Sequence, residues 1–389
     1  MNIAILGYGT VGSGVKEITK DKVLKVFDLP IKKDQIGDTY TDSFSDIIES
    51  PDIQTVVETM GGNDFPYKLI VEALKNSKNV VTSNKEVVSL HLDEFLKLAK
   101  ENDCYFLFEA SVGGGIPIIH SLIENSKINE INHIYGIMNG TTNYILSRIE
   151  EGMDFDSALN LAKVNGFSEA DPTNDLEGLD MVRKISILSD IAYNTFIDIN
   201  DVYHYSIKGI NKEIIDYLKK KGLTVKYISE SIRDENGIYL SVEPVIFKLS
   251  DKISSTKDEY NSITFNGSTN GTLEFYGKGA GKYPTASAVV SDIEKIKDEN
   301  CTMDLTLSNK YRILERPKAK YFIYTKEELD ESLYEIKDNN YYFTKEIDLD
   351  EVKSIEFYAR LNLYEEIWYC DSWCDRACWE HIPKSHGGI

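Results

Sequence analysis

Residues 2–12 read NIAILGYGTVG, in which a short apolar strand runs directly into three glycines at the G-x-G-x-x-G spacing. A short helical pattern, Ser13–Thr19, follows. Gly7 permits a tight turn, Gly9 leaves the backbone open to a ligand, and Gly12 allows the strand and the helix to pack closely. Free N–H groups at the start of a helix attract phosphates. The stretch therefore predicts dinucleotide binding, and a glycine-rich turn without a ligand is the alternative.

The first 110 residues repeat this strand-and-helix pattern. Short runs rich in Val, Ile and aromatic residues indicate strands that are buried on both faces: Asn2–Leu6, Val23–Phe27, Gln54–Thr59, Asn79–Thr82 and Cys104–Glu109. Helical spacing of apolar residues lies between them, at Phe65–Ser77 and His91–Asn102. Repeated units of this kind predict an α/β fold with a doubly wound, Rossmann-type parallel sheet and right-handed crossovers.

The end of the second strand bears on the choice of dinucleotide. Asp28 lies 21 residues after Gly7, where an acid holds the ribose 2′-hydroxyl of NAD. Lys32 and Lys33 follow closely and suit the 2′-phosphate of NADP instead. All three could also be solvated loop residues. The residues therefore predict NAD or NADP, with a slight preference for NAD.

Length and composition limit the partners of the chain. Its 389 residues suffice for two or three domains, and 43 basic against 64 acidic residues give a net charge of −21. This charge argues against a nucleic acid or an anionic membrane as the partner. No apolar run approaches the ~18 residues of a membrane span, and no secretory signal pattern is present, so a cytoplasmic location is expected. Five cysteines argue against a disulfide framework.

Helical patterns dominate the middle of the chain, at Pro117–Asn125, Thr142–Glu150, Phe155–Asn165 and Leu176–Ala192. Strand patterns follow at Ile238–Val245 and Ser262–Phe265. We therefore expect a dinucleotide-binding domain over 1–130, completed by about 277–300, and an α+β catalytic domain over 131–300.

The remaining residues, 301–389, are rich in Tyr and acidic residues and predict a small C-terminal α/β module. Its expected strands are Lys320–Thr325, Tyr341–Ile347 and Glu366–Cys370, and its expected helices are Lys326–Lys337 and Leu349–Leu361. Near the end, metal-ligating side chains recur at helical spacing, at Cys370, Cys374, Cys378 and His381. They could bind zinc or another thiophilic metal. We favour the alternative of a packed helix of reduced cysteines and tryptophans.

An acidic stretch in the middle of the chain holds the strongest candidates for chemistry. Residues 166–180 read GFSEADPTNDLEGLD and include Glu169, Asp175 and Asp180. Lys184 lies four residues after Asp180, on the same face of the expected helix. Burial on a partly apolar face favours the neutral form of a lysine amine, which suits it to proton transfer. An ordinary surface ion pair and a Mg²⁺ or Ca²⁺ site are the alternatives.

Three further stretches place polar groups near strand ends. Lys85 follows the fourth strand, at the edge where open α/β sheets bind ligands, although an ordinary loop lysine also fits. The glycine-rich run 109–117 suits either a close-approach loop for a ligand or a sharp turn. Residues 139–143, NGTTN, indicate a helix cap whose polar groups could line a pocket.

Taken together, these segments resemble homoserine dehydrogenase. The matching strings occur in the family's order over about residues 1–300: ILGYGTVGSGV, TSNKEVVS, EASVGGGIPII, GIMNGTTNYIL, GFSEADPTNDLEGLDMVRKISIL and GKGAGKYPTASAVVSDI. The resemblance implies the NAD(P)-dependent interconversion of L-homoserine and L-aspartate 4-semialdehyde in threonine and methionine biosynthesis, by a homodimer that pairs through its middle domain. Another dehydrogenase of a small amino acid or semialdehyde, and a catalytically silent ligand sensor, are the alternatives.

The resemblance also implies roles for individual residues. Lys184 matches the acid/base lysine of the family, and Lys85 matches a lysine near the nicotinamide and the substrate. The acids that match the substrate site are Glu169, Asp175 and Asp180. The residues that match the cofactor site are Gly7, Gly9, Thr10, Val11, Gly12, Thr59 and Gly279. The residues that match a sodium site built largely from main-chain carbonyls are Glu109, Val112, Gly114 and Ile116.

Two departures from the family pattern limit what is carried over. No arginine directly follows the second strand, which leaves the preference between NAD and NADP open. Residues 301–389 lack the proline-glycine signature of the amino-acid-binding ACT domain, although their expected element order is loosely similar. A diverged ACT-like module is therefore an expectation without an assigned effector.

Overall fold

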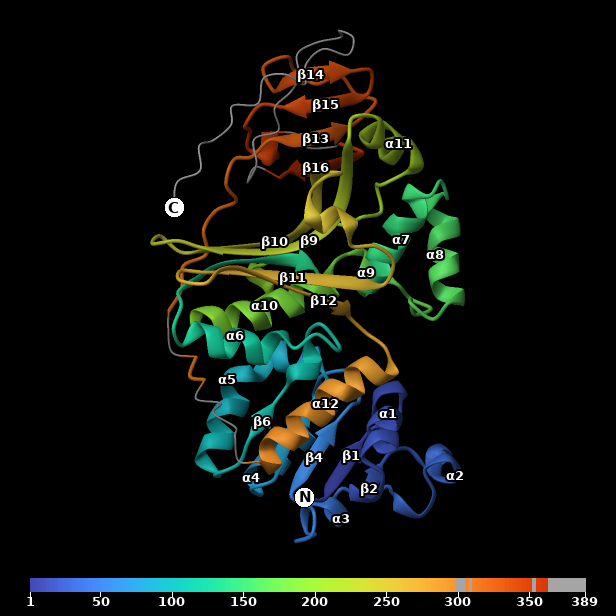
Figure 1. The fold of residues 1–389 in the computed structure, drawn as a ribbon, viewed down its shortest axis with the longest axis vertical. Helices are drawn as coiled ribbons and strands as arrows, with labels where there is room; N and C mark the ends of the chain where they lie inside the picture. The colour runs from blue at the N-terminus through green and yellow to red at the C-terminus, as the bar shows by residue number, and fades with distance from the viewer. Residues whose placement is uncertain (299–304, 308–309, 352–354, 363–389) are drawn as a thin grey trace, which may run out of the picture.

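The computed structural model describes residues 1–389 except 299–304, 308–309, 352–354 and 363–389. Its N-terminal part is a six-stranded sheet in which every strand is parallel to its neighbours, in the order β3-β2-β1-β4-β5-β6 (Figure 1). The strands are β1 Ile3–Leu6, β2 Val23–Phe27, β3 Tyr40–Thr41, β4 Thr55–Glu58, β5 Asn79–Thr82 and β6 Phe106–Leu107. This order confirms the predicted doubly wound sheet.

Helices cover both faces of this sheet. They are α1 Thr10–Thr19, α2 Lys33–Ile36, α3 Ser45–Ile48, α4 Asp64–Lys75, α5 Lys85–Glu101 and, from much later in the chain, α12 Lys282–Lys297. α12 packs against α1 and shares a core with β1 and β2, to which Val289 and Ile293 contribute. α1 begins at Thr10, three residues before the predicted start, because the helix opens directly at the glycine turn.

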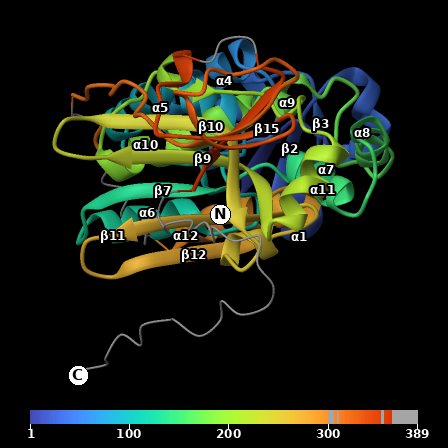
Figure 2. The ribbon, with the colours of Figure 1, turned by 90° about the horizontal axis from the view of Figure 1, so that it is seen from above.

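A second sheet of ten strands forms the rest of the described chain, in the order β12-β11-β7-β9-β10-β16-β13-β15-β14, with β8 paired to β10. Figure 2 shows β10, β9, β7, β11 and β12 side by side. Its strands are β7 Ile131–Ile137, β8 Tyr203–His204, β9 Leu223–Arg233, β10 Ile238–Lys248, β11 Tyr260–Gly267, β12 Gly271–Lys278, β13 Tyr321–Tyr324, β14 Tyr334–Asp338, β15 Tyr341–Thr344 and β16 Phe357–Leu361. This mixed sheet confirms the expected α+β architecture.

One helix connects the two sheets. The helices of this part are α6 Ile118–Ser126, α7 Gly140–Glu150, α8 Phe155–Val164, α9 Thr173–Leu176, α10 Leu179–Tyr193 and α11 Lys212–Lys220. α10 packs against β7, β9 and β10 on one side and against α5 and α6 on the other. Thirteen of its fifteen residues are buried, because apolar side chains occur around its whole circumference. Side chains on α10 are therefore placed between the two parts of the molecule.

The C-terminal segment corrects part of the sequence analysis. The helices expected at Lys326–Lys337 and Leu349–Leu361 are wrong. Strand β14 occupies the last residues of the first range, and strand β16 occupies the last residues of the second. In β14 the exposed side chains of Glu335 and Lys337 alternate with less exposed neighbours, which is a strand period. β13 and β15 confirm the strands that were expected at Lys320–Thr325 and Tyr341–Ile347. The strand expected at Glu366–Cys370 lies outside the described residues.

These C-terminal strands extend the large sheet. β16 pairs in parallel with β10 and antiparallel with β13, and β13 continues to β15 and β14. Arg360 of β16 reaches Glu230 of β9 and lies 3.0 Å from Glu243 of β10, atom Nε to Oε1. The segment is therefore joined to the middle of the chain by backbone pairing and by buried charged contacts.

Candidate active site

A cleft of about 920 Å³ lies between the two parts of the molecule. The six-stranded part contributes the start of α1 and the loops after β4 and β5. The other part contributes the start of α7, the acidic loop and α10. The lining residues fall in the segments 10–11, 60–62, 83–86, 110–114, 139–141, 165–175, 180–184, 259 and 278–285.

The glycine turn opens into this cleft. Gly7 has a φ of +93°, which a side chain rarely allows. A Cβ on Gly12 would lie 1.9 Å from the carbonyl oxygen of Gly7, whereas nothing lies within 4 Å of a Cβ built on Gly9. Thr10 and Val11 line the cleft at the N-terminus of α1. Open backbone at Gly9 beside free helix N–H groups fits a pyrophosphate, so the geometry suits a dinucleotide.

The side chains of Thr59 and Asp28 form hydrogen bonds to the backbone of this turn. The hydroxyl of Thr59 donates to the carbonyl oxygens of Gly7 at 2.8 Å and Leu6 at 3.1 Å, so it holds the turn in place. The carboxylate of Asp28 accepts the backbone N–H of Tyr8 at 2.5 Å. Neither side chain borders the cleft, but both determine the shape of the turn that does.

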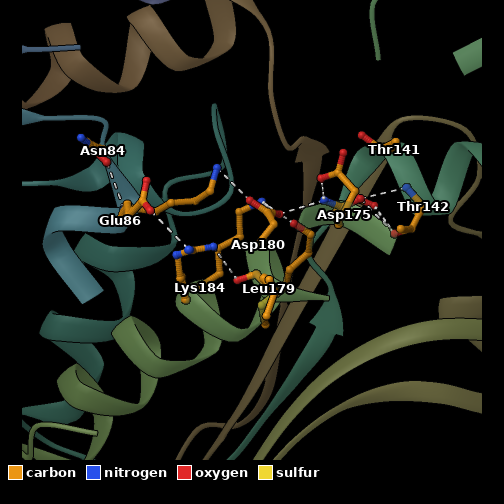
Figure 3. Close-up of polar contacts among 12 residues, drawn as sticks. Asn84, Glu86, Thr141, Thr142, Asp175, Leu179, Asp180 and Lys184 are labelled. Atoms are coloured by element: carbon orange, nitrogen blue, oxygen red, sulfur yellow. Dashed lines mark hydrogen bonds and ion pairs between the residues drawn. The ribbon is translucent and has the colours of Figure 1, made fainter. Parts of the chain in front are cut away.

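Asp180 is the centre of a polar cluster on the opposite side of the cleft (Figure 3). Its Oδ1 lies 2.8 Å from Lys85 Nζ, and its Oδ2 lies 2.7 Å from Lys184 Nζ. Lys184 Nζ also donates to the carbonyl oxygen of Met138 at 2.6 Å. The Asn139 amide donates to Asp180 at 2.8 Å. Lys85 belongs to α5 and Asp180 to α10, so the two parts of the molecule meet in this ion pair.

The charges in this cluster shift one another's protonation. Burial alone would raise the pKa of Asp180, but the ammonium groups of Lys184 and Lys85 outweigh it and hold that pKa well below its ordinary value. The carboxylate of Asp180 in turn raises the pKa of Lys85. Burial, followed by the negative charge of Asp180, raises the pKa of Asp175. The cluster therefore contains one firmly ionised acid next to a second acid that gains protons more readily.

Of the remaining predicted substrate acids, Glu169 lies in the loop before α9 and Asp175 lies in α9 itself. Asp175 accepts the Asn139 amide at 2.7 Å, which ties α9 to the start of α7. Glu169 is exposed and borders the cleft. The structure thus brings Lys85, Lys184, Asp175 and Asp180 together, with Glu169 at the rim.

In the glycine-rich loop after β6, the carboxylate of Glu109 is held by backbone N–H groups, unlike a carboxylate that ligates a metal ion. Both carboxylate oxygens of Glu109 accept backbone N–H groups at the start of α6, from Ile119 at 2.9 Å and His120 at 2.8 Å. Among the described residues no group of three or more His, Cys, Asp or Glu side chains could hold a metal. Gly114 borders the cleft, and a Cβ on it would lie 2.6 Å from the carbonyl carbon of Gly279. Val112 and Ile116 are buried.

Several groups of the cleft were not assigned a role in the sequence analysis. Asn139 was expected to belong to a helix cap whose polar groups could line a pocket, and it does cap α7 by accepting the Thr142 N–H at 2.8 Å. Its amide also holds Asp175 and Asp180, which the helix-cap signal does not reveal. Arg183 lies 3.3 Å from Glu86, from Nη2 to Oε1, across the boundary between α10 and α5. No local pattern predicts a contact between residues so distant in sequence.

The fold and this cleft define an NAD(P)-dependent oxidoreductase: a doubly wound sheet presents a glycine turn to one side, and a lysine–carboxylate cluster faces it. The family model described as the NAD binding domain of homoserine dehydrogenase matches residues 7–109, and the model of homoserine dehydrogenase matches residues 117–293. The homoserine dehydrogenase of Bacillus subtilis is 39% identical over 311 residues, which are 75% of this chain and 72% of the relative. The chain belongs to the homoserine dehydrogenase family.

Solved structures agree with this assignment. A homoserine dehydrogenase from Thiobacillus denitrificans superimposes with a TM-score of 0.83 at 27% identity, over 93% of this chain and 98% of its own. A hyperthermophilic archaeal homoserine dehydrogenase in complex with NADPH gives a TM-score of 0.66 at 28% identity, over 77% of this chain and 98% of its own. The predicted activity, an NAD(P)-dependent step of amino-acid biosynthesis, is confirmed at the level of the family.

Two other expectations concern parts or properties beyond the cleft. The cysteines and the histidine near the end, Cys370, Cys374, Cys378 and His381, lie outside the described residues. In the part of the chain that the structure describes, no helix has the length and apolar character that crossing a membrane requires.

Proposed function

We propose that Lys184 exchanges the proton of the substrate hydroxyl in the homoserine dehydrogenase reaction. During oxidation of homoserine, the hydroxyl proton passes to the unprotonated amine of Lys184 while the hydrogen on the same carbon leaves as hydride, and in the reverse reaction the Lys184 ammonium returns the proton to the carbonyl oxygen. Bound NAD(P)⁺ supplies the acceptor for that hydride. The observation that carries the proposal is that Lys184 borders the cleft, with its Nζ 2.7 Å from the buried carboxylate of Asp180 and 2.6 Å from the carbonyl oxygen of Met138.

The acids and Lys85 complete the site in this proposal. Glu169 and Asp175 receive the ammonium group of the amino acid, since both border the cleft. Asp180 adds negative charge to this substrate site and orients both lysines, because each of its oxygens contacts one of them. Lys85 contacts Asp180 from the side of the cleft where the dinucleotide would bind. Holding these groups in place before substrate arrives lowers the barrier to proton transfer.

The test is turnover of homoserine by purified protein in which Lys184 is replaced. General acid–base catalysis contributes about 10²–10⁴-fold, so Lys184→Ala should lower kcat by at least about a hundredfold. Lys100→Ala serves as the control, because Lys100 is an exposed lysine near the end of α5. Near-normal turnover of the Lys184 variant would remove it from the mechanism.

We also propose that the enzyme favours NAD over NADP. The negative charge of Asp28 lies beside the glycine turn, at the end of β2, where it would repel a 2′-phosphate. The archaeal relative in complex with NADPH shows that the family accommodates the phosphorylated form in at least one member. The ratio of kcat/KM for the two cofactors measures the preference directly.

We further propose a sodium ion at the loop after β6, with the main-chain carbonyl oxygens of Glu109, Val112, Gly114 and Ile116 as ligands. Oxygen ligands suit a hard cation. In the described chain, no backbone hydrogen bond of a turn or loop ends on the carbonyl oxygens of Val112 or Gly114. Replacing NaCl with choline chloride at constant ionic strength should lower activity, and equal activity in both salts would contradict the site.

Finally, we propose a homodimer that pairs through the middle domain, and a cytoplasmic location, both by resemblance to the family. β12 supports the pairing, because it lies at an edge of the large sheet and none of its residues is buried. Light scattering at micromolar concentration measures the mass, and a monomer would contradict the proposal.

A further inference from the structure

A buried carboxylate lies directly beneath the dinucleotide side of the cleft. Glu58 is the last residue of β4, and its side chain has no exposure to solvent. Its Oε1 accepts the backbone N–H of Met60 at 2.7 Å, and its Oε2 accepts the hydroxyl of Thr82 at 2.5 Å. Its neighbour in the strand, Val57, is fully buried in an apolar core. A carboxyl group in such surroundings is costly, so it calls for a role that an apolar residue would not fill.

The hydroxyl of Thr82 connects Glu58 to the loop that follows β5. Thr82 is the last residue of β5 and lies opposite Glu58 in the ladder between the two strands. Its hydroxyl oxygen accepts the backbone N–H of Asn84 at 3.0 Å. Because that oxygen is accepting from Asn84, its own hydrogen is free to be donated, and Glu58 is the acceptor. The chain of hydrogen bonds therefore runs from Asn84 through Thr82 to Glu58.

Asn84 connects the same chain to the walls of the cleft. Its amide donates to the carbonyl oxygen of Gly62 at 2.9 Å, and its Oδ1 accepts the N–H of Glu86 at 3.1 Å, which caps α5. Lys85 is the first residue of that helix and reaches Asp180. The loop 60–62 and the residues 83–86 all border the cleft. Glu58 thus holds both loops without reaching the cleft.

We infer that Glu58, acting through Thr82 and Asn84, is a positioning residue that fixes Lys85 and the loop 60–62 relative to each other across the dinucleotide side of the cleft. The inference rests on the proposed role of Lys85 in the active site. It assigns no contact between Glu58 and substrate. The carboxylate serves because it accepts from both the Met60 N–H and the Thr82 hydroxyl at once, which an apolar residue of similar size does not.

The test compares threonines that are equally buried in adjacent strands. Thr82→Val removes the hydroxyl that links Asn84 to Glu58, and Thr82→Ser keeps it. Thr55→Val is the matched control, because Thr55 is also fully buried but lies at the opposite end of β4. Measurements are kcat and KM with homoserine, the Kd for NADH and NADPH by fluorescence, and the melting temperature of each full-length variant.

We expect Thr82→Val to lower kcat at least tenfold and to weaken dinucleotide binding at least threefold. Thr82→Ser should restore most of both, and Thr55→Val should leave both within twofold of the unmodified enzyme even where it melts earlier. The inference is overturned if Thr82→Val behaves like Thr55→Val in kcat and in Kd. Should the unmodified protein fail to oxidise homoserine, the proposed function fails, while the dinucleotide Kd still decides on the inference.

A double variant shows whether Glu58 and Thr82 affect kcat through the same chain of hydrogen bonds or independently of each other. If Glu58 acts through Thr82, Glu58→Gln combined with Thr82→Val should reduce kcat no further than the more damaging single change. Losses that multiply would show that the two residues act independently and would overturn the proposed chain. Both outcomes are read at full cofactor saturation, so weak dinucleotide binding does not imitate a loss of kcat.

Discussion

At the scale of single residues, the site depends on carboxylates whose surroundings give them different tasks. Asp180 stays ionised beside two ammonium groups, Asp28 supports the glycine turn, and Glu58 is buried under the loops of the cleft. The spacing of Asp180 and Lys184 predicted their contact, because four residues separate neighbours on a helix. The contact of Lys85 with Asp180 depends on how two distant helices pack. The residues predicted only that Lys85 follows a strand at the ligand-binding edge of the sheet, and the family resemblance predicted that it lies near the nicotinamide and the substrate.

Cofactor choice is one property that a single residue should change. Asp28→Asn keeps the shape of the side chain and removes its charge, so repulsion of a 2′-phosphate disappears. We expect the ratio of kcat/KM for NADP to that for NAD to rise about tenfold, equivalent to about 1.4 kcal/mol. Asp34→Asn, in the nearby helix α2, is the control and should leave the ratio unchanged. An unaltered ratio in the Asp28 variant would show that this carboxylate does not read the ribose.

Glu58 should make the stability of the protein depend on pH. Burial raises its pKa to about 7 from an ordinary value of 4.5, so the folded state binds a proton more tightly than the unfolded state. The resulting stabilisation is complete below pH 4.5 and is lost as the pH rises through about 7. Relative to Glu58→Gln, the free energy of unfolding of the unmodified protein should fall by about 2–3 kcal/mol between pH 5 and pH 8.

Urea unfolding at the two pH values measures this difference. Glu49→Gln, a change at an exposed carboxylate of the same part of the molecule, is the control, and because it keeps Glu58 its stability should vary with pH as that of the unmodified protein does. An equal pH dependence of the Glu58 variant and the unmodified protein would mean that Glu58 does not titrate in this range.

At the scale of elements, the helices that frame the site were predicted well and several strands were not. α7, α8 and α10 carry clear helical periods, and side chains cap the starts of α7 and α8, so their positions followed from the sequence. β9 was missed, although it lies near the centre of the large sheet. It is buried on both faces for most of its length, so the alternation that marks a strand is absent, and polar Lys226 and Glu230 interrupt its apolar run.

The cap of α7 should matter for chemistry as well as for stability. Asn139→Ala removes the acceptor for the Thr142 N–H together with the amide that holds Asp175 and Asp180. Loss of a cap costs about 1 kcal/mol of unfolding free energy, and loss of the amide should also lower kcat/KM for homoserine at least tenfold. Steady-state kinetics and urea unfolding of the same sample measure the two effects.

The control is Asp154→Ala, which removes the cap of α8 at the exposed Ser157 N–H. It should lose a similar amount of stability and keep its activity. If both variants lose activity in proportion to stability, the Asn139 amide has no role in the site beyond capping.

At the scale of the whole molecule, the doubly wound sheet and the cleft at its edge followed from the sequence, because local motifs mark them. The placement of the C-terminal segment did not. The ranges Lys326–Lys337 and Leu349–Leu361 fit a helix when taken locally, and the pairing of β14 with β15 and of β16 with β10 and β13 makes their ends strands. The buried contacts of Arg360 with Glu230 and Glu243 belong to the same long-range packing.

Those contacts predict that residues after 300 stabilise the middle of the chain. Arg360→Ala removes the partner that two buried carboxylates share, although Glu243 keeps Arg316 and Glu230 keeps His133. The free energy of unfolding should therefore fall by about 3 kcal/mol, the lower end of the cost of breaking a buried ion pair. Lys320→Ala breaks an exposed ion pair with Glu335 and should cost less than about 1 kcal/mol. Urea unfolding of both full-length variants gives the comparison, and equal losses would show that the Arg360 contacts contribute no more than a surface pair.

The position of α10 between the two sheets has a mechanical consequence. The helix that carries Lys184 packs against α5, which carries Lys85, and equally against the strands behind it. A large hinge opening of the halves would have to pull this shared helix away from one of its two supports. Substrate entry and product release should therefore depend on small rearrangements of surface segments such as 165–175. The geometry of the proton-transfer groups should stay the same through each turnover.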